Sequence, residues 1–150
     1  MPAGTANPSK TTHTVFGSVN AIIQKYGLFE GTVTAFTTNN ILIGINASHI
    51  NAGPHATHFL YLTFPIDIKN KRYEFVDGGP VQPPVFRQIK NGQHTLHEPK
   101  RNTGHITFNF DRDNGTLSAP FNFSFIDSTT QEELMFTGEI KAQGIQLQLR

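Results

Sequence analysis

Hydrophobic and polar residues alternate through the C-terminal third of the chain. Apolar residues recur at every second position in the segments 106–110, 121–125, 134–140 and 145–149. Successive side chains of a β-strand point to opposite faces, so a period of two predicts a strand with one buried and one exposed face. Such strands are typical of antiparallel sheets. This part of the chain is therefore predicted to be a set of antiparallel strands.

Residues that favour tight turns separate several of the predicted strands. Asp113-Asn114-Gly115 lies between two alternating segments, Asn91-Gly92 joins VFRQIK to QHTLH, and Asn39-Asn40 joins GTVTAFT to ILIGINA. Asn and Gly tolerate the positive φ angles that short hairpin turns require. These three positions are predicted hairpins.

The middle of the chain is less regular. Residues 58–66 (HFLYLTFPI) are apolar at both parities, which predicts a central strand covered on both faces, and residues 71–76 (KRYEFV) predict a further strand. Residues 78–84 (GGPVQPP) interrupt the pattern, because proline donates no backbone hydrogen bond. We interpret 78–84 as a long excursion within one domain.

One segment, residues 18–27, fits a short helix. Starting from Val19, apolar residues occupy positions i, i+3, i+4 and i+7, with Ser18 as an N-cap and Gly27 as the end. A strand with a bulge is the alternative for the same residues.

Taken together, the segments predict an all-β domain of about 8–10 short strands, either a β-sandwich or a closed antiparallel β-barrel. Both architectures produce the same alternation, so the pattern leaves the two open. Residues 13–150 are predicted to be a single domain, and residues 1–12 a flexible N-terminal arm.

Composition and charge exclude several classes of function. The chain has no cysteine, which rules out disulfides and thiolate-held metals. Its net charge is +1, and the densest basic runs, Lys69–Arg72 and Lys100–Arg101, are too sparse for a nucleic-acid surface. We find no signal peptide and no membrane span, so we expect a cytoplasmic protein by default, with export by another route left open.

Histidine is the first candidate for chemistry. His49, His55 and His58 fall within ten residues and predict a metal site, although strand geometry places residues three apart on opposite faces. Exposed loop histidines are the competing interpretation.

The second histidine cluster is His94-Thr95-Leu96-His97-Glu98. In a strand, His94 and Leu96 would face one way and His97 the other, and we favour a solvent-exposed edge strand. Nucleophile-elbow, phosphate-loop and dinucleotide motifs are absent from the sequence, so no cofactor is expected.

The leading functional hypothesis is a non-enzymatic binding module for a small molecule, glycan or protein. Thirteen Phe are expected to fill the core, and the long segments 47–57 and 77–104 are expected to present loops to a ligand. The predicted ligand-binding residues are Tyr61, Tyr73, His55 and His97.

Two alternatives stay open. The first is a cofactor-free or metal-assisted enzyme in a barrel that uses His55, His58, His94 and His97. The second is a structural subunit of a homo-oligomer, joined through edge strands such as the C-terminal GIQLQLR.

Overall fold

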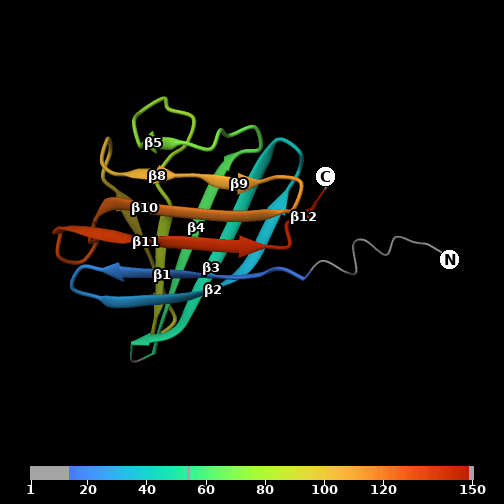
Figure 1. Ribbon diagram of the computed structural model, residues 1–150. Helices are drawn as coiled ribbons and strands as arrows, with labels where there is room; N and C mark the ends of the chain where they lie inside the picture. Colours follow the sequence, from blue (N-terminus) through green and yellow to red (C-terminus); the bar gives the residue numbers. More distant parts are fainter. Residues whose placement is uncertain (1–13, 54, 149–150) are drawn as a thin grey trace.

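All regular secondary structure in the described residues is β-strand. A computed structural model describes residues 14–53 and 55–148 (Figure 1). Its strands are β1 (Phe16–Ile23), β2 (Gly27–Thr38), β3 (Leu42–Gly53), β4 (Ala56–Pro65), β5 (Arg72–Glu74), β6 (Val85–Lys90), β7 (Gln93–Pro99), β8 (His105–Thr107), β9 (Asn109–Asp111), β10 (Thr116–Ile126), β11 (Glu133–Gln143) and β12 (Gln146–Leu147). The predicted arm, residues 1–12, lies outside the described residues.

Eight of these strands close into an antiparallel barrel, which decides between barrel and sandwich. The order around the ring is β11-β1-β2-β3-β4-β6-β7-β10, and β10 pairs again with β11. The β10–β11 seam runs along both strands, whereas β7 and β10 share two residue pairs, Phe125 with Pro99 and Ile126 with Glu98. In Figure 1, β10, β11 and β1 run across the view and β3 and β4 cross behind them.

Four shorter strands lie outside the ring. β8 and β9 pair with the part of β10 that β7 leaves free, and β5 pairs with β8. β12 pairs with β2 in parallel, so Gln146 and Leu147 of the C-terminal segment already pair within their own chain. Pairing of this segment with a neighbouring chain stays a prediction.

The barrel interior is filled with aromatic rings, as the alternating pattern predicts. Phe121, Phe123 and Phe125 of β10 all point inward and are buried. The rings of Phe123 and Phe136 stack with their centroids 5.3 Å apart. Phe is therefore the main filler of this core.

The predicted helix over residues 18–27 is wrong. These residues form most of β1 and the β1–β2 turn, with Val19, Ala21 and Ile23 buried, while Ile22 is 62% exposed. β1 pairs with β11 on one side and β2 on the other, and this pairing outweighs a local pattern that also fits a helix.

Two further expectations for the middle of the chain need correction. β4 is paired on both edges, but its outer face is not covered by a second layer, because Tyr61 is 41% exposed and Phe59 lies under the Arg87 guanidinium at 4.7 Å. The expected loops 47–57 and 77–104 contain the β3–β4 and β6–β7 hairpins, so much of each is strand.

The predicted hairpin turns are confirmed. Asn91 and Gly92 have φ angles of 53° and 78° and link the paired residues Lys90 and Gln93, as expected for a two-residue turn. Asn40 and Gly115 also have positive φ angles, of 71° and 65°, between paired strands.

Candidate functional site

A group of polar side chains is buried at one end of the otherwise apolar barrel. His58, His97 and Asp127 are at most 4% exposed, and all three lie at the end where the β1–β2, β3–β4, β6–β7 and β10–β11 turns gather. Tyr26 of the β1–β2 turn packs against both histidines. We term these four residues the mouth cluster.

Tyr26 closes this end of the barrel with its ring. The ring meets those of His58, Phe86 and His97 edge-on, at centroid distances of 5.6, 5.9 and 6.0 Å. Its hydroxyl donates a hydrogen bond of 2.6 Å to Oδ2 of Asp127 in the β10–β11 loop. Tyr26 thus joins two turns that are about a hundred residues apart in the chain.

Asp127 organises the β10–β11 loop. Its Oδ1 accepts the backbone N–H groups of Thr129 at 2.8 Å and Thr130 at 3.1 Å. Burial acts to raise the pKa of Asp127, but the bonds from Tyr26, Thr130 and Thr129 outweigh it, so the pKa is lowered. Burial and the Asp127 carboxylate together raise the pKa of Tyr26. At neutral pH the pair is therefore a carboxylate and a neutral phenol.

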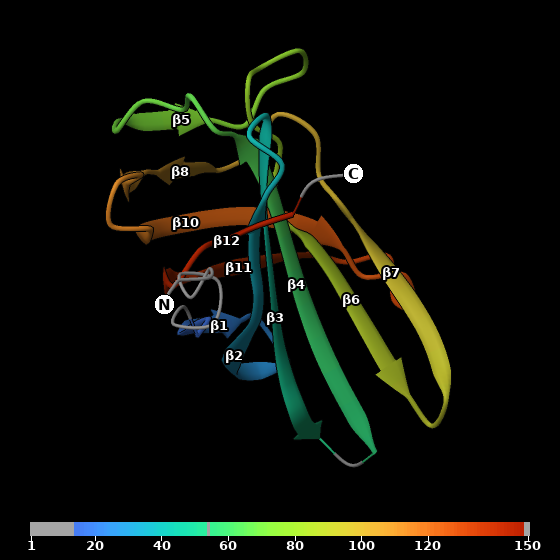
Figure 2. The same cartoon turned by 90° about the vertical axis from the view of Figure 1, so that its right-hand side faces the viewer.

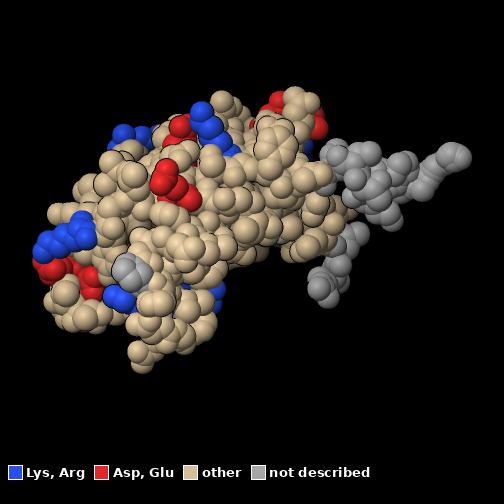
Figure 3. Space-filling model, turned by 90° about the horizontal axis from the view of Figure 1, so that it is seen from below, with Lys and Arg blue, Asp and Glu red and all other residues tan. Residues whose placement is uncertain are grey.

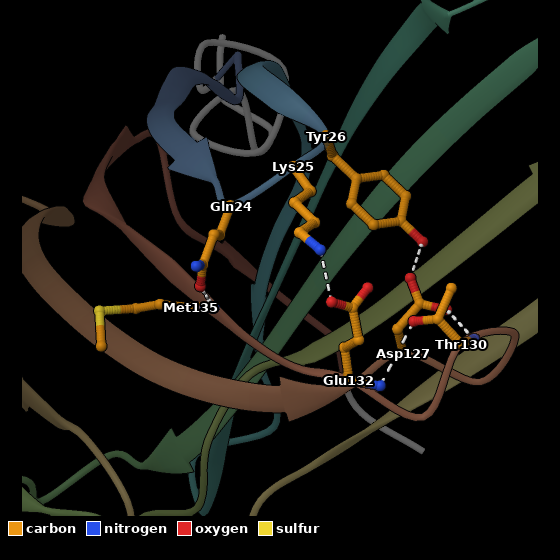
Figure 4. A network of polar contacts seen from close by, with 7 residues as sticks. All are labelled: Gln24, Lys25, Tyr26, Asp127, Thr130, Glu132 and Met135. Carbon is orange, nitrogen blue, oxygen red and sulfur yellow. Dashed lines mark hydrogen bonds and ion pairs between the residues drawn. The ribbon is translucent and has the colours of Figure 1, made fainter.

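Figure 4 shows the β1–β2 turn and the β10–β11 loop facing each other across these contacts. An exposed ion pair between Lys25 and Glu132 lies beside the Tyr26–Asp127 bond. Gln24 adds a backbone link, since its N–H donates to the carbonyl of Met135 at 2.9 Å. Two contacts thus join the two turns, and the third joins the β1–β2 turn to the start of β11.

His97 is held as a neutral ring by its partners. Its Nδ1 accepts the backbone N–H of Ser128 at 3.2 Å, so the ring proton lies on Nε2, which faces Oε1 of Gln88 at 3.4 Å. The ring stacks on Phe86 with a centroid distance of 5.0 Å. Burial lowers the pKa of His97, while the charge of Asp127 acts in the opposite direction.

His58 is the least satisfied member of the mouth cluster. Its Nδ1 is buried without a hydrogen-bond partner, and its ring meets the edge of Phe86 at 5.3 Å. Burial, followed by the proximity of His49 and His97, lowers the pKa of His58 to about 4. His49 lies opposite His58 on β3 and accepts the backbone N–H of Glu30 on Nδ1.

A surface hollow of about 410 Å³ opens beside the mouth cluster. It lies between the β1–β2 turn, the β6–β7 hairpin and the β10–β11 loop. Every side chain that lines it carries a polar group: Tyr26, Gln88, Lys90, Asn91, Gln93, Thr95, Asp127, Thr129 and Thr130. These groups can donate and accept hydrogen bonds to a polar molecule of small size.

The structure does not bring the predicted ligand-binding residues together. Tyr61 lies on the outer face of β4, where its hydroxyl leans over Gly44 beside a second hollow of about 240 Å³. Tyr73 packs on Phe108, and its hydroxyl accepts the N–H of Lys69. His55 is exposed in the β3–β4 turn, so of these four predicted residues only His97 belongs to the mouth cluster.

The histidine sets are separated in a similar way. His49 and His58 face each other across β3 and β4, but His55 stands apart in the turn, and residues 14–53 and 55–148 hold no group of three side chains placed to bind a metal ion. The metal site at His49, His55 and His58 thus stays a prediction without geometric support. His94 is exposed on the outer face of β7, away from His97.

The expectation of a solvent-exposed edge strand at residues 94–98 is wrong for His97, which is 1% exposed. The two faces of β7 do separate His94 and Leu96 from His97, as the alternation predicts. Tyr26 and Asp127 were missed because one fell in the predicted helix and the other in a polar turn. A turn aspartate followed by Ser-Thr-Thr was the available signal.

No family model matches the chain, and neither the curated proteins nor the solved structures contain a significant match to it. Within the described residues there is no helix that could cross a membrane.

Figure 3 shows that the face seen from below is largely uncharged, with its Lys, Arg, Asp and Glu side chains in small separate groups. The site geometry therefore carries the functional argument.

Proposed function

We propose that the protein is a non-enzymatic binding module that holds a small, hydroxyl-rich molecule, such as a sugar, in the hollow beside the mouth cluster. The observation that carries this proposal is that the half-buried Tyr26 and the buried Asp127 line a polar hollow, with the buried His97 packed against Tyr26, in a barrel otherwise filled by Phe. The filled interior favours a ligand at the mouth over one inside the barrel.

The lining supports an uncharged polar ligand. Amide and hydroxyl side chains dominate, and the ammonium of Lys90 offsets the carboxylate of Asp127 in the same hollow. Amides and hydroxyls both donate and accept, which suits the hydroxyl groups of a sugar. The half-buried ring of Tyr26 adds an aromatic surface at the inner wall.

The contacts within the mouth cluster support binding over catalysis. A general base needs a lone pair that can reach a substrate proton. Nδ1 of His97 already accepts a hydrogen bond from the protein, and the bonds to Asp127 lower its pKa, which makes its carboxylate a weak base. The raised pKa of Tyr26 also makes its phenol a poor acid at neutral pH.

The test is an NMR titration of isotope-labelled protein with neutral mono- and disaccharides. We expect shift changes confined to the amides of residues 88–95 and 127–130. The double variant Gln93→Ala and Thr95→Ala should weaken the affinity about tenfold, the effect of losing roughly 1.4 kcal/mol of contacts. Thr63→Ala, beside the second hollow, is the matched control and should bind as the unchanged protein does. Shifts centred on Tyr61, or no saturable shift with any sugar, would contradict the proposal.

A further inference from the structure

His49 lies where backbone pairing between β2 and β3 ends. The last residue pair towards the mouth is Thr32 with Ser48. The next residue on β3 is His49, and its Nδ1 accepts the backbone N–H of Glu30 at 3.1 Å. A histidine ring thus continues the seam by one hydrogen bond beyond the backbone ladder.

His97 occupies the equivalent place on the other flank. The last residue pair between β7 and β10 towards the mouth is Glu98 with Ile126. The neighbouring His97 accepts the backbone N–H of Ser128 on Nδ1 at 3.2 Å. The Ser128 hydroxyl adds a bond of 2.9 Å to the carbonyl of Leu96. Both seams therefore end in the same way, with an imidazole Nδ1 capping an amide two residues beyond the last pair.

The strands between the two seams form one unit. β3, β4, β6 and β7 stay paired with each other to their hairpin tips, at Gly53 with Ala56 and at Lys90 with Gln93. Figure 2 shows these four strands projecting together, away from β1, β10 and β11. We term residues 49–53, 55–58 and 87–97 the flap. Beyond the backbone ladders, His49 and His97 tie the flap to the rest of the barrel.

His49 and His97 can each accept the backbone amide on Nδ1 only while the imidazole ring is neutral. A neutral imidazole that accepts on Nδ1 carries its proton on Nε2, so an added proton must go to Nδ1. The protonated nitrogen can no longer accept the amide and would face it with a second N–H. We propose that His49 and His97 are clasps of the flap, and that protonation of His97 in mildly acidic solution releases its seam and opens the mouth of the barrel.

The surroundings of His97 favour this response, because they disfavour a proton on the ring in the closed protein. The titratable and charged groups near the two clasps come from each neighbouring element: Glu30 of β2, His58 of β4, Lys90 of β6, Lys25 and Tyr26 of the β1–β2 turn, and Asp127 and Glu132 of the β10–β11 loop. Asp127 favours a cation at His97, but burial has the larger effect and lowers the pKa of that ring. A proton on His49 or His97 also disfavours a proton on the buried His58 between them.

The role of this opening rests on the proposed function, because it would regulate access to the same hollow. Its test therefore uses ligand-free protein, so that absence of ligand binding and absence of a gate are separate results. Amide hydrogen exchange is measured by NMR between about pH 7.5 and about pH 4.5, a range that spans the ordinary histidine pKa of about 6.5. We expect the protection factor of the Ser128 amide to fall as the pH drops below that value, because the folded protein holds the pKa of His97 below it.

A variant isolates the His97 clasp. His97→Gln keeps an acceptor that does not titrate and should remove the pH dependence of the Ser128 amide. His94→Gln, on the outer face of β7, is the matched control and should behave like the unchanged protein. The wild-type profile decides the matter even if a variant does not fold. Constant protection of Ser128 in the unchanged protein would overturn the proposal, as would a pH dependence of Ser128 that persists in His97→Gln.

Discussion

The two ends of the barrel are built from opposite kinds of side chain, although the same strands supply both. His58 and Phe64 lie on the same face of β4, about 20 Å apart at the usual rise of a strand. Phe64 packs on Phe108 with a centroid distance of 4.7 Å, whereas His58 faces Tyr26 and leaves a ring nitrogen without a partner. One end is therefore stabilised by apolar burial and the other depends on polar contacts among buried groups.

This difference separates a structural end from an end suited to function. Apolar burial does not depend on protonation, so the end around Phe64 should be insensitive to pH. Buried polar groups are costly unless each is satisfied, and a protein keeps such groups where they serve specificity or a site. Three predictions test this contrast, starting from the largest expected effect.

Truncating the apolar end should have the largest effect on stability. Phe64→Ala removes a ring that is 1% exposed and in contact with Phe108 and Phe110, and we expect it to lower the free energy of unfolding by about 3–5 kcal/mol. Chemical denaturation at about pH 7.5 and pH 5 should show the same loss at both values, because no titrating group is involved. A loss that changed strongly with pH would contradict the contrast between the ends.

His58 should make the mouth sensitive to acid. Its pKa of about 4 in the folded protein lies below the ordinary value of about 6.5, so below that value the unfolded chain binds a proton that the folded protein does not. Stability should fall as the pH drops from about 6.5 to 4 and level off below that, with a total contribution of about 3 kcal/mol. Denaturation curves of His58→Leu should lack this component.

The control for His58 is His94→Leu, because His94 is exposed on the outer face of β7. That variant should keep the full acid sensitivity of the unchanged protein. If both variants lost acid sensitivity to the same extent, the buried ring would not be its source.

The smallest expected effects come from removing two tyrosine hydroxyls, one at each end of the comparison. Tyr26→Phe removes a bond to the ionised Asp127 and should cost about 1.5–3 kcal/mol. Tyr73→Phe removes a neutral bond, in which the hydroxyl accepts the N–H of Lys69, and should cost about 0.5–1.5 kcal/mol. Chemical denaturation at neutral pH measures both, and equal losses would show that the charge of Asp127 adds nothing.

Local pattern was informative where neighbours in sequence are also neighbours in structure. The inward set Phe121, Phe123 and Phe125 and the turn at Asn91-Gly92 follow from strand geometry and from the φ angles that Asn and Gly tolerate. The same reasoning failed at residues 18–27, where spacings of three and four positions coexist with a period of two. Pairing of β1 with β11, more than a hundred residues away, decided that segment.

The candidate site was less accessible to sequence reasoning. The alternation does separate His97 from His94, but it does not tell which of the two faces lies inside. Tyr61 and Tyr73 were plausible from residue type, yet Tyr61 lies on the outer face of β4, and Tyr73 lies on β5, outside the ring, where it packs on Phe108. Burial of a particular histidine depends on what the other strands bring to it.

The amino-acid sequence by itself determined an antiparallel all-β fold, its main turns and a core of Phe, because strand periodicity and turn conformation are properties of a few adjacent residues. Closure into a barrel, and the meeting of Tyr26 with His97 and Asp127, were decided by tertiary structure alone. Each requires pairing or packing between distant segments, and the energy of such contacts belongs to the assembled fold and not to any one segment.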